Sequence, residues 1–288
     1  MEPTVDGRTL HIEDDGDPQA PPVLVLHGIT QSVATWSWLV PHLAEDHRVV
    51  RLDFRGHGRS GRAPGAYDFP GYVADATAVC EQVLGRPAVI VGHSLGGGTA
   101  AGLAQIRPDL VRGVVLEDPA LLDATASPAG DGLEGNTVIA AFEVMRSSIP
   151  MMQEAGMTVS ALADLLRDLP SPSGPPFGEV VFDDAIEAMA EAMLLLDVTV
   201  LDPVFDGGMA PVFDPNRELP VPGIVLAGDP AMPDTVVTRR DPALLAEHSP
   251  TLEQRVVPGA GHLIHDSLLY RDAVLAAVQD LLARLDSE

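Results

Sequence analysis

The 288-residue chain contains no lysine, so all seventeen of its basic residues are arginine. A lysine Schiff base, a pyridoxal-phosphate site and a Walker-type phosphate loop each require a lysine amine, and the sequence excludes all three. Cysteine is also scarce, because Cys80 stands alone and no internal disulfide can form. Its place in the segment YVADATAVCEQVL predicts a small apolar residue on a helix face rather than a nucleophile.

Long apolar runs and positive charge are lacking as well. The first residues, MEPTVD, carry neither a basic region nor an apolar stretch, and we expect a soluble, cytoplasmic protein. The chain has 17 basic and 42 acidic residues, which give a formal net charge of −25. Nucleic acid and anionic membranes would be repelled, so neither is an expected partner, whereas small neutral substrates remain open. The sequence leaves a homodimer open.

Short apolar runs alternate with amphipathic stretches in residues 8–118 and again from residue 221 onward. An edge strand is expected at 8–13, and buried strands at 22–28, 47–54, 88–94, 111–118, 221–229 and 252–259. Helices are expected at 32–46, 70–85, 96–109, 241–249 and 265–285. Such alternation predicts an α/β protein with a mostly parallel, doubly wound sheet.

The middle of the chain, residues 121–217, differs from this pattern. It holds seven of the nine methionines and a hinge-like segment, LPSPSGPPFG. We interpret it as a helical cap inserted into a core made of residues 1–120 and 218–288. The methionines would give the cap an adaptable apolar underside, although packing between cap helices explains any one of them equally well.

The segment VIVGHSLGGGTA, residues 89–100, places one serine between glycines directly after a buried strand. Residues 92–96 fit the pattern G-x-S-x-G of a nucleophile elbow, in which a strained turn exposes the serine. Side chains at Gly92 and Gly96 would collide with neighbouring backbone, which explains both glycines. Ser94 is therefore the expected nucleophile.

A catalytic serine needs a base, and its oxyanion needs two donors. His262, in VVPGAGHLIHDS, follows the last strand and is the expected base, while His265 is expected at a helix start or on the surface. His93 should pack beneath the elbow. The amides of Leu95 and Ile29 are the expected donors.

A second glycine pattern, GHGRSG at residues 56–61, fits G-x-G-x-x-G with Asp75 about twenty residues further on. Pro64 and Gly65 interrupt any helix that would open there, so dinucleotide binding is not expected. No H-x-x-x-H or cysteine cluster occurs, and neither a metal nor a cofactor is expected.

The segments LHGIT, LDFRGHGRS, GHSLGG and PGAGH follow one another as in the α/β-hydrolase superfamily, which this chain resembles across its sheet domain. The resemblance implies the α/β-hydrolase fold, a cap between the sixth and seventh strands, and a serine esterase or lactonase. It also implies a catalytic acid between Ser94 and His262 in the chain.

The acid itself stays open. Many relatives carry it after the seventh strand in a pattern like Gly-acid-x-Asp, but Ala231 occupies that aspartate position, leaving Asp229 and Asp234. Some haloalkane dehalogenases and the zearalenone-type lactone hydrolases use a glutamate after the sixth strand, where this chain has Glu117 beside Asp118. We expect Glu117 first, then Asp234, then Asp118 and Asp229. A hinge role at the base of the cap is the alternative for Glu117.

The expected reaction is hydrolysis of a carboxylic ester or lactone of an apolar small molecule through an acyl-enzyme. Gly28, Trp36 and Met193 are the expected substrate-binding residues, although Trp36 and Trp38 suit the core equally well. The serine argues against haloalkane dehalogenase and epoxide hydrolase chemistry, whose elbows carry aspartate. The alternatives are a cofactor-free perhydrolase, a C–C hydrolase or a lyase on the same triad, and a non-catalytic ligand receptor.

Overall fold

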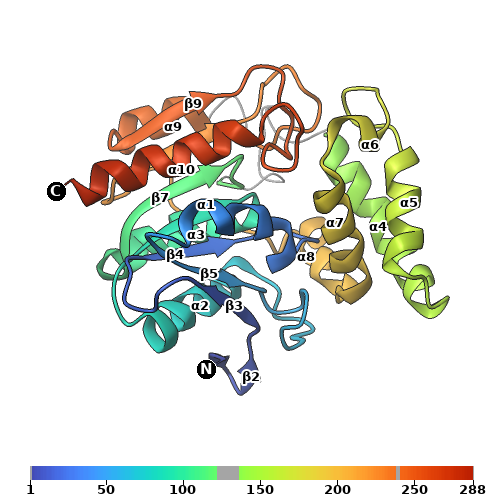
Figure 1. The fold of residues 1–288 in the computed structure, drawn as a ribbon, viewed down its shortest axis with the longest axis horizontal. Coiled ribbons are helices and arrows are strands. Elements are labelled where there is room, and N and C mark those ends of the chain that lie inside the picture. Colours follow the sequence, from blue (N-terminus) through green and yellow to red (C-terminus); the bar gives the residue numbers. More distant parts are fainter. Residues whose placement is uncertain (1, 122–135, 238–240, 288) are drawn as a thin grey trace.

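The computed structural model describes residues 2–121, 136–237 and 241–287 of the chain. Its centre is a seven-stranded sheet with the order β3-β5-β4-β6-β7-β8-β9 (Figure 1). The strands are β3 (Ile12–Asp15), β4 (Pro22–Leu26), β5 (Arg48–Leu52), β6 (Ala88–His93), β7 (Val111–Glu117), β8 (Gly223–Ala227) and β9 (Leu252–Val256). Strand β3 runs antiparallel to β5 and the other pairs are parallel. The expected α/β class is confirmed.

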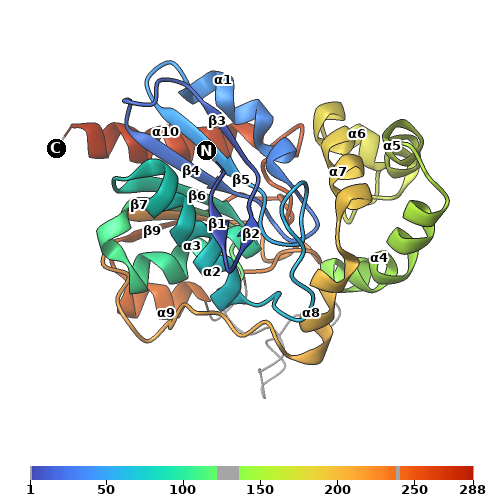
Figure 2. The same ribbon diagram turned by 90° about the horizontal axis from the view of Figure 1, so that it is seen from below.

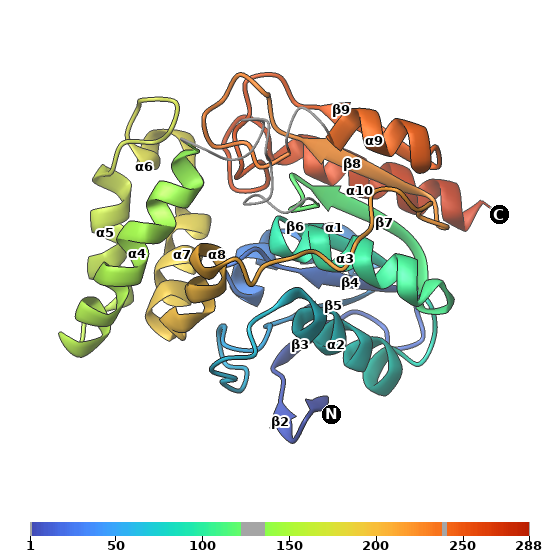
Figure 3. The same ribbon diagram turned by 180° about the vertical axis from the view of Figure 1, so that it is seen from behind.

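Helices cover both faces of this sheet (Figures 2 and 3). One face carries α2 (Phe69–Val79), α3 (Leu95–Ile106) and α9 (Asp241–His248). The other carries the 3₁₀-helix η1 (Val33–Leu39), α1 (Val40–Leu43) and α10 (Arg271–Asp286). A π-helical turn η2 (Cys80–Leu84) ends α2, a 3₁₀ turn η3 (Pro108–Leu110) follows α3, and β1 (Thr4–Val5) pairs with β2 (Arg8–Thr9). Cys80 is fully buried, as expected, and burial raises the pKa of its thiol to about 12.

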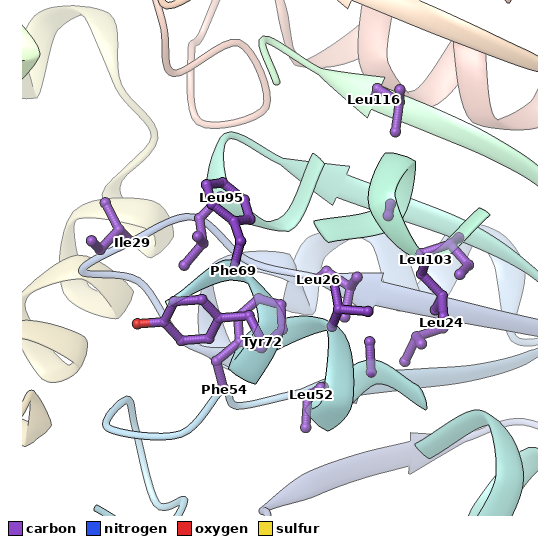
Figure 4. Close-up of a cluster of buried hydrophobic side chains, with 14 of the residues drawn as sticks. Leu24, Leu26, Ile29, Leu52, Phe54, Phe69, Tyr72, Leu95, Leu103 and Leu116 are labelled. Atoms are coloured by element: carbon purple, nitrogen blue, oxygen red, sulfur yellow. The ribbon is translucent and has the colours of Figure 1, made fainter. Parts of the chain in front are cut away.

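Two apolar cores sandwich the sheet because successive strand residues face opposite sides. In β4, Val23 and Val25 join the core beneath α10, whereas Leu24 and Leu26 join the core beneath α3. Figure 4 shows the second core, in which the Tyr72 hydroxyl points away from the leucines of the sheet. Burial on both faces explains why these strands are continuous apolar runs.

Between β7 and β8 the chain forms a set of helices, which we call the helical insertion (residues 136–217). It comprises α4 (Thr137–Glu154), α5 (Val159–Asp168), α6 (Phe177–Val180), α7 (Asp183–Leu195), the 3₁₀-helix η4 (Val198–Leu201) and α8 (Asp202–Asp206). Figures 1 and 2 show it beside the carboxyl ends of the parallel strands. The predicted cap begins at residue 121, and residues 122–135 of that range lie outside the described residues. The predicted domain bounds stay a prediction.

Two expected helices are shorter than predicted. Residues 32–46 form η1 and then α1, because Pro41 lacks the N–H of a helix interior and instead stands at the start of α1. Helix α10 begins at Arg271, six residues after the expected start at residue 265. Among the described residues, no helix is both long and apolar enough to cross a membrane.

Candidate active site

Ser94 joins β6 to α3 in a backbone conformation that non-glycine residues rarely adopt. Its φ is 52°, in the left-handed region. The turn is held by hydrogen bonds of 2.9 Å from the Ser94 N–H to the Glu117 carbonyl oxygen and from the Gly98 N–H to the Ser94 carbonyl oxygen. The Ser94 hydroxyl has no hydrogen-bond partner among the described residues, so it is available to react.

Glycines around this turn make room for backbone. A Cβ added at Gly92 would lie 2.4 Å from the Gly96 carbonyl oxygen, and one added at Gly96 would lie 2.4 Å from the Leu26 carbonyl oxygen. A Cβ at Gly28 would lie 2.6 Å from Nδ1 of His93. Each position therefore requires glycine, and for Gly92 and Gly96 the obstacle is the backbone that the elbow pattern predicts.

His262 lies on the loop after β9, where its ring is held by Asp118. Nδ1 of His262 is 2.6 Å from Oδ2 of Asp118, and both side chains are buried. The Asp118 carboxylate also accepts hydrogen bonds from the amides of Val236 (2.8 Å), Val237 (3.3 Å) and Gly228 (3.3 Å). This pairing directs the Nδ1 proton of His262 to Asp118 and leaves Nε2 as the basic nitrogen.

Glu117, the acid expected first, does not contact the His262 ring, whereas Asp118, which was expected third, does. The Glu117 carboxylate accepts a hydrogen bond of 2.8 Å from the His265 N–H, and both of its oxygens lie 2.9 Å from Nδ1 of His265. Adjacent residues at a strand end point to different sides, so only one of the two carboxylates reaches His262. The expectation for His265 was wrong, since its side chain is fully buried.

The other two acids that the sequence left open do not contact the His262 ring. Asp234 is buried and accepts a hydrogen bond of 3.1 Å from the main-chain N–H of His262. Asp229 is half-buried and accepts hydrogen bonds from the amides of Ala231 and Gly259; both bonds lower the pKa of its carboxyl, and the Ala231 bond has the larger effect. The first supports the histidine loop, and the second supports its own turn.

The two expected oxyanion donors have no acceptor within the part of the chain that the structure describes. Neither the Ile29 N–H nor the Leu95 N–H is engaged there, and Leu95 is the first residue of α3. Unengaged amides at a helix start and on a neighbouring loop are what a developing oxyanion requires. Thr30 has a φ of 70°, so the loop that carries Ile29 is itself in a rare conformation.

The expected substrate-binding residues have different surroundings. Trp36 is fully buried and stacks on the His265 ring at 4.3 Å, so it belongs to the core, and its predicted substrate contact is wrong. Met193 is buried on α7 in the same apolar core as Ile29 and Leu95, and its substrate contact stays a prediction. Gln31 and Asp266 also lie at the site, and no sequence motif predicted either of them.

Three buried side chains could in principle share a metal. His93, Glu117 and His265 place ligand atoms within 4.8 Å of one another. Both ring nitrogens of His93 already lie 3.0 Å from oxygen acceptors on Gln31 and His262, and Nδ1 of His265 is engaged by Glu117. A cation would have to replace these contacts, so we do not assign one here.

The second glycine pattern, residues 56–61, does not open a helix. The Asp53 carboxylate accepts a hydrogen bond of 2.9 Å from the Arg59 N–H, and α2 begins only at Phe69. A dinucleotide fingerprint requires a helix N-terminus directly after its glycines. The loop therefore lacks the geometry that such a fingerprint needs.

Comparisons with known proteins agree with this arrangement. A family model of the α/β hydrolase fold matches residues 21–142. A serine hydrolase-like protein of Danio rerio is 43% identical over 99 residues, 34% of this chain and 30% of that protein. The chain thus spans about a third of that curated relative. The sn-1-specific diacylglycerol lipase ABHD11 of Mus musculus is 26% identical over 260 residues, 87% of this chain and 78% of that protein.

Solved structures match over nearly the full length. The crystal structure of E-2-(acetamidomethylene)succinate hydrolase superimposes with a TM-score of 0.72 at 22% identity, covering 98% of each chain. This likeness extends the shared fold beyond residue 142, where the family model ends. The elbow, the parallel sheet and these matches together show that the chain has the α/β-hydrolase fold, and the family model places residues 21–142 within it.

Proposed function

We propose that this protein is a serine hydrolase that cleaves a carboxylic ester or lactone of a neutral, apolar small molecule. One observation carries the proposal: the His262 ring is held by a buried carboxylate at 2.6 Å, on the loop that meets the Ser94 elbow. A serine, a histidine with a fixed tautomer and two unengaged amides are the parts that acyl transfer needs.

In the first half of the reaction, Nε2 of His262 takes the proton of the Ser94 hydroxyl while the oxygen attacks the carbonyl carbon. The amides of Ile29 and Leu95 stabilise the negative charge that develops on the carbonyl oxygen. Asp118 stabilises the imidazolium that forms. The imidazolium then gives its proton to the departing alkoxide, and an ester linkage to Ser94 remains.

In the second half, water replaces the alcohol. Nε2 of His262 takes a proton from the water molecule, whose oxygen attacks the acyl-enzyme carbonyl. The same two amides stabilise the second oxyanion. The proton returns to the Ser94 oxygen as the acid leaves, so the enzyme regains its starting state.

The arginines around the helical insertion support a neutral substrate. Arg146 pairs with Asp202 at 3.1 Å, and Arg59 lies 3.6 Å from Glu191 of α7. Arg62 donates to the carbonyl oxygens of Gly56 and Leu195. These guanidinium groups are already engaged, and the acidic insertion would repel a carboxylate on the substrate. The apolar core that contains Ile29, Leu95 and Met193 favours a hydrophobic group near the serine.

The test is a rapid-mixing assay with p-nitrophenyl esters of increasing chain length and an aromatic macrolactone. We expect a burst of p-nitrophenol close to one equivalent per chain, which Ser94→Ala abolishes. A p-nitrophenyl ester with a terminal carboxylate is the matched probe for charge, and it should react at least about tenfold more slowly than the neutral ester of equal length.

Two outcomes would contradict this proposal. Equal inertness of the wild type and Ser94→Ala on every ester, without labelling by a fluorophosphonate, would favour a ligand receptor. Faster turnover of the carboxylate ester would overturn the neutral substrate class while leaving the hydrolase intact. Turnover with hydrogen peroxide in place of water, followed by product analysis, separates hydrolysis from perhydrolysis.

A further inference from the structure

A second histidine–carboxylate pair lies directly behind the first. His262 pairs with Asp118, and His265, three residues later, pairs with Glu117, one residue earlier. The second pair is completely buried, with no exposed surface on either side chain. It is too deep to touch a substrate, and the proposed reaction does not use it.

Each of four segments of the proposed active site contributes one or two residues to this deeper layer. The oxyanion loop, the elbow, the end of β7 and the histidine loop contribute Gln31, His93, Glu117, His265 and Asp266, which we call the buried polar layer. Every member lies within four residues of one of Ile29, Ser94, Asp118 and His262. The layer therefore connects four segments that are far apart in the sequence.

Gln31 links the oxyanion loop to the elbow and to the histidine loop. Its side-chain oxygen accepts a hydrogen bond of 2.9 Å from the Gly28 N–H and lies 3.0 Å from Nδ1 of His93. Its side-chain nitrogen donates to Asp266 at 3.3 Å. Nε2 of His93 lies 3.0 Å from the main-chain oxygen of His262. The backbone of the expected base is thus held from the elbow.

Glu117 links the remaining segments. Its main-chain oxygen accepts the Ser94 N–H, its carboxylate engages both the N–H and Nδ1 of His265, and Asp118 is its neighbour in the chain. A change in this one carboxylate would therefore reach the nucleophile, the acid and the histidine loop together.

The charges of the layer need a buried cation. His265 is flanked by Glu117 at 2.9 Å and by Asp266, whose carboxylate oxygen lies 3.3 Å from Nε2. Burial acts to lower the pKa of His265, but Asp266 and Glu117 outweigh burial and Arg271, so the pKa is raised. The Trp36 ring stacked on His265 also suits a cation.

The other groups that face His265 fit the same charge state. Burial raises the pKa of Asp266 to about 6, with His265 acting against it. The His93 ring lies 4.9 Å from the His265 ring, and burial together with both histidine neighbours lowers the pKa of His93. Arg271 donates through Nε to the His265 main-chain oxygen. A neutral His93 has one N–H, so it donates to only one of its two oxygen neighbours, Oε1 of Gln31 or the main-chain oxygen of His262.

We propose that the buried polar layer, with His265 as an imidazolium, positions Ser94, Asp118 and His262 for catalysis. Without the cation, two buried carboxylates would lose their charged partner and the histidine loop would shift. Misplacement of a base by about 1 Å can cost on the order of a hundredfold in rate. The kinetic part of this inference rests on the proposed hydrolase function, whereas the charge of His265 does not.

The kinetic test uses His265→Gln and Glu117→Gln, with rates expressed per serine titrated by a fluorophosphonate. We expect kcat to fall about 30- to 300-fold while KM stays within about threefold, because positioning acts on the transition state. The kcat of the double variant should lie no more than about threefold below that of the less active single variant, since the pair acts as a unit. His47→Gln, which removes another histidine–carboxylate contact at 3.3 Å to Asp286, is the matched control and should stay within twofold.

A second background separates positioning from general damage. In Asp118→Asn, His262 has already lost its orientation, so His265→Gln should cost less than about threefold there. An unchanged large loss in that background, or a normal kcat per titrated serine in both single variants, would overturn the positioning role.

The charge of His265 is read directly by NMR of ¹⁵N-histidine-labelled wild type, whether or not the protein hydrolyses anything. We expect both ring nitrogens of His265 to be protonated at pH 8, with assignment by the missing signal in His265→Gln or, if that variant does not fold, by the shifted signal in Glu117→Gln. A neutral ring at pH 8 would overturn the imidazolium even in an active esterase.

Discussion

At the scale of single residues, backbone strain marks the proposed site without reference to any motif. The angle φ is 70° at Thr30, 52° at Ser94 and 35° at Asp118, and Asp6 is the one other described non-glycine residue with a positive φ. These three residues lie on three different loops that meet at the site. Such conformations cost of order 1–3 kcal/mol each and persist where the surrounding structure enforces them. Their coincidence supports a built active site.

The choice between two nearby carboxylates gives the first prediction. Asp118→Asn should lower kcat for a p-nitrophenyl ester by about three to four orders of magnitude, because an amide lets His262 adopt the wrong tautomer. Asp234→Asn should cost less than about tenfold, because Asp234 meets the main-chain N–H of His262 and an amide oxygen can still accept it. Loss of turnover in Asp234→Asn with retained turnover in Asp118→Asn would move the acid to the loop after β8.

A buried neutral histidine gives the second prediction, on acid stability. Burial lowers the pKa of His57 to about 4, against the hydrogen bond to the Arg55 carbonyl oxygen, which acts to raise it. Between pH 6.5 and 4, His57 therefore binds a proton in the unfolded chain but stays neutral in the folded chain. Stability is present above pH 6.5 and falls as the pH drops, by up to about 3 kcal/mol for this group.

Urea unfolding at several pH values between 7 and 4.5 tests this assignment. The free energy of unfolding should fall less steeply with decreasing pH in His57→Gln than in the wild type. The same substitution at His42, whose side chain lies in water, is the matched control and should give a curve parallel to the wild type. Parallel curves for His57→Gln and the wild type would show that the folded state accepts the proton.

At the scale of elements, the helical insertion is tied to the core by a hydroxyl on the segment before α2. Tyr67 donates a hydrogen bond of 2.6 Å to Asp197, just before η4, and accepts one of 2.7 Å from the Ala63 N–H. Tyr67→Phe should lower the free energy of unfolding by about 1–3 kcal/mol, because it leaves buried polar groups unpaired. Limited proteolysis should also cut the insertion sooner.

Tyr72 provides the matched control for that change. Its hydroxyl is buried and has no hydrogen-bond partner in the described part of the chain (Figure 4). Tyr72→Phe removes the same atom without breaking a bond, so stability should stay the same or rise. Equal losses in Tyr67→Phe and Tyr72→Phe, measured by urea unfolding, would mean that the contact with Asp197 does not anchor the insertion.

Most elements of the sheet domain could be predicted from the sequence because each strand is an apolar run with a turn or helix signal after it. Strands β4 to β9 all lie within the predicted ranges, and the elbow glycines meet backbone as expected. Helix lengths were harder to predict. A proline divides residues 32–46, and α10 begins only after the buried residues 265 and 266.

The acid could not be chosen from the sequence, because the choice depends on how distant loops meet. Glu117 ends β7 and Asp118 follows it directly, and His262 and His265 share one loop, so two pairings satisfy the same pattern. The loop after β8 decides between them by giving Asp118 the amides of Val236 and Val237. Such a contact across 118 or more residues leaves no local signal in the sequence.

At the scale of the whole molecule, the net charge of −25 opposes the compact state. The helical insertion concentrates this charge, with thirteen acidic residues and three arginines in residues 136–217. Some repulsion is offset locally, since Arg167 lies within 4.0 Å of Asp164, Asp183 and Glu187. These ion pairs are exposed, and exposed pairs contribute little each. Repulsion should therefore outweigh them.

Salt separates long-range repulsion from ion pairing because it screens the first more strongly than the second. Raising NaCl from about 20 to 200 mM shortens the Debye length from about 20 Å to about 7 Å, which removes long-range repulsion before it removes contacts between paired atoms. The melting temperature at pH 7 should rise by roughly 2–6 °C, the shift that corresponds to about 1–2 kcal/mol in a chain of this size. At pH 5, where some carboxylates carry protons, the rise should be smaller. A melting temperature that falls with salt at pH 7 would show instead that ion pairs such as those of Arg167 dominate, and Arg167→Gln would then remove most of that fall.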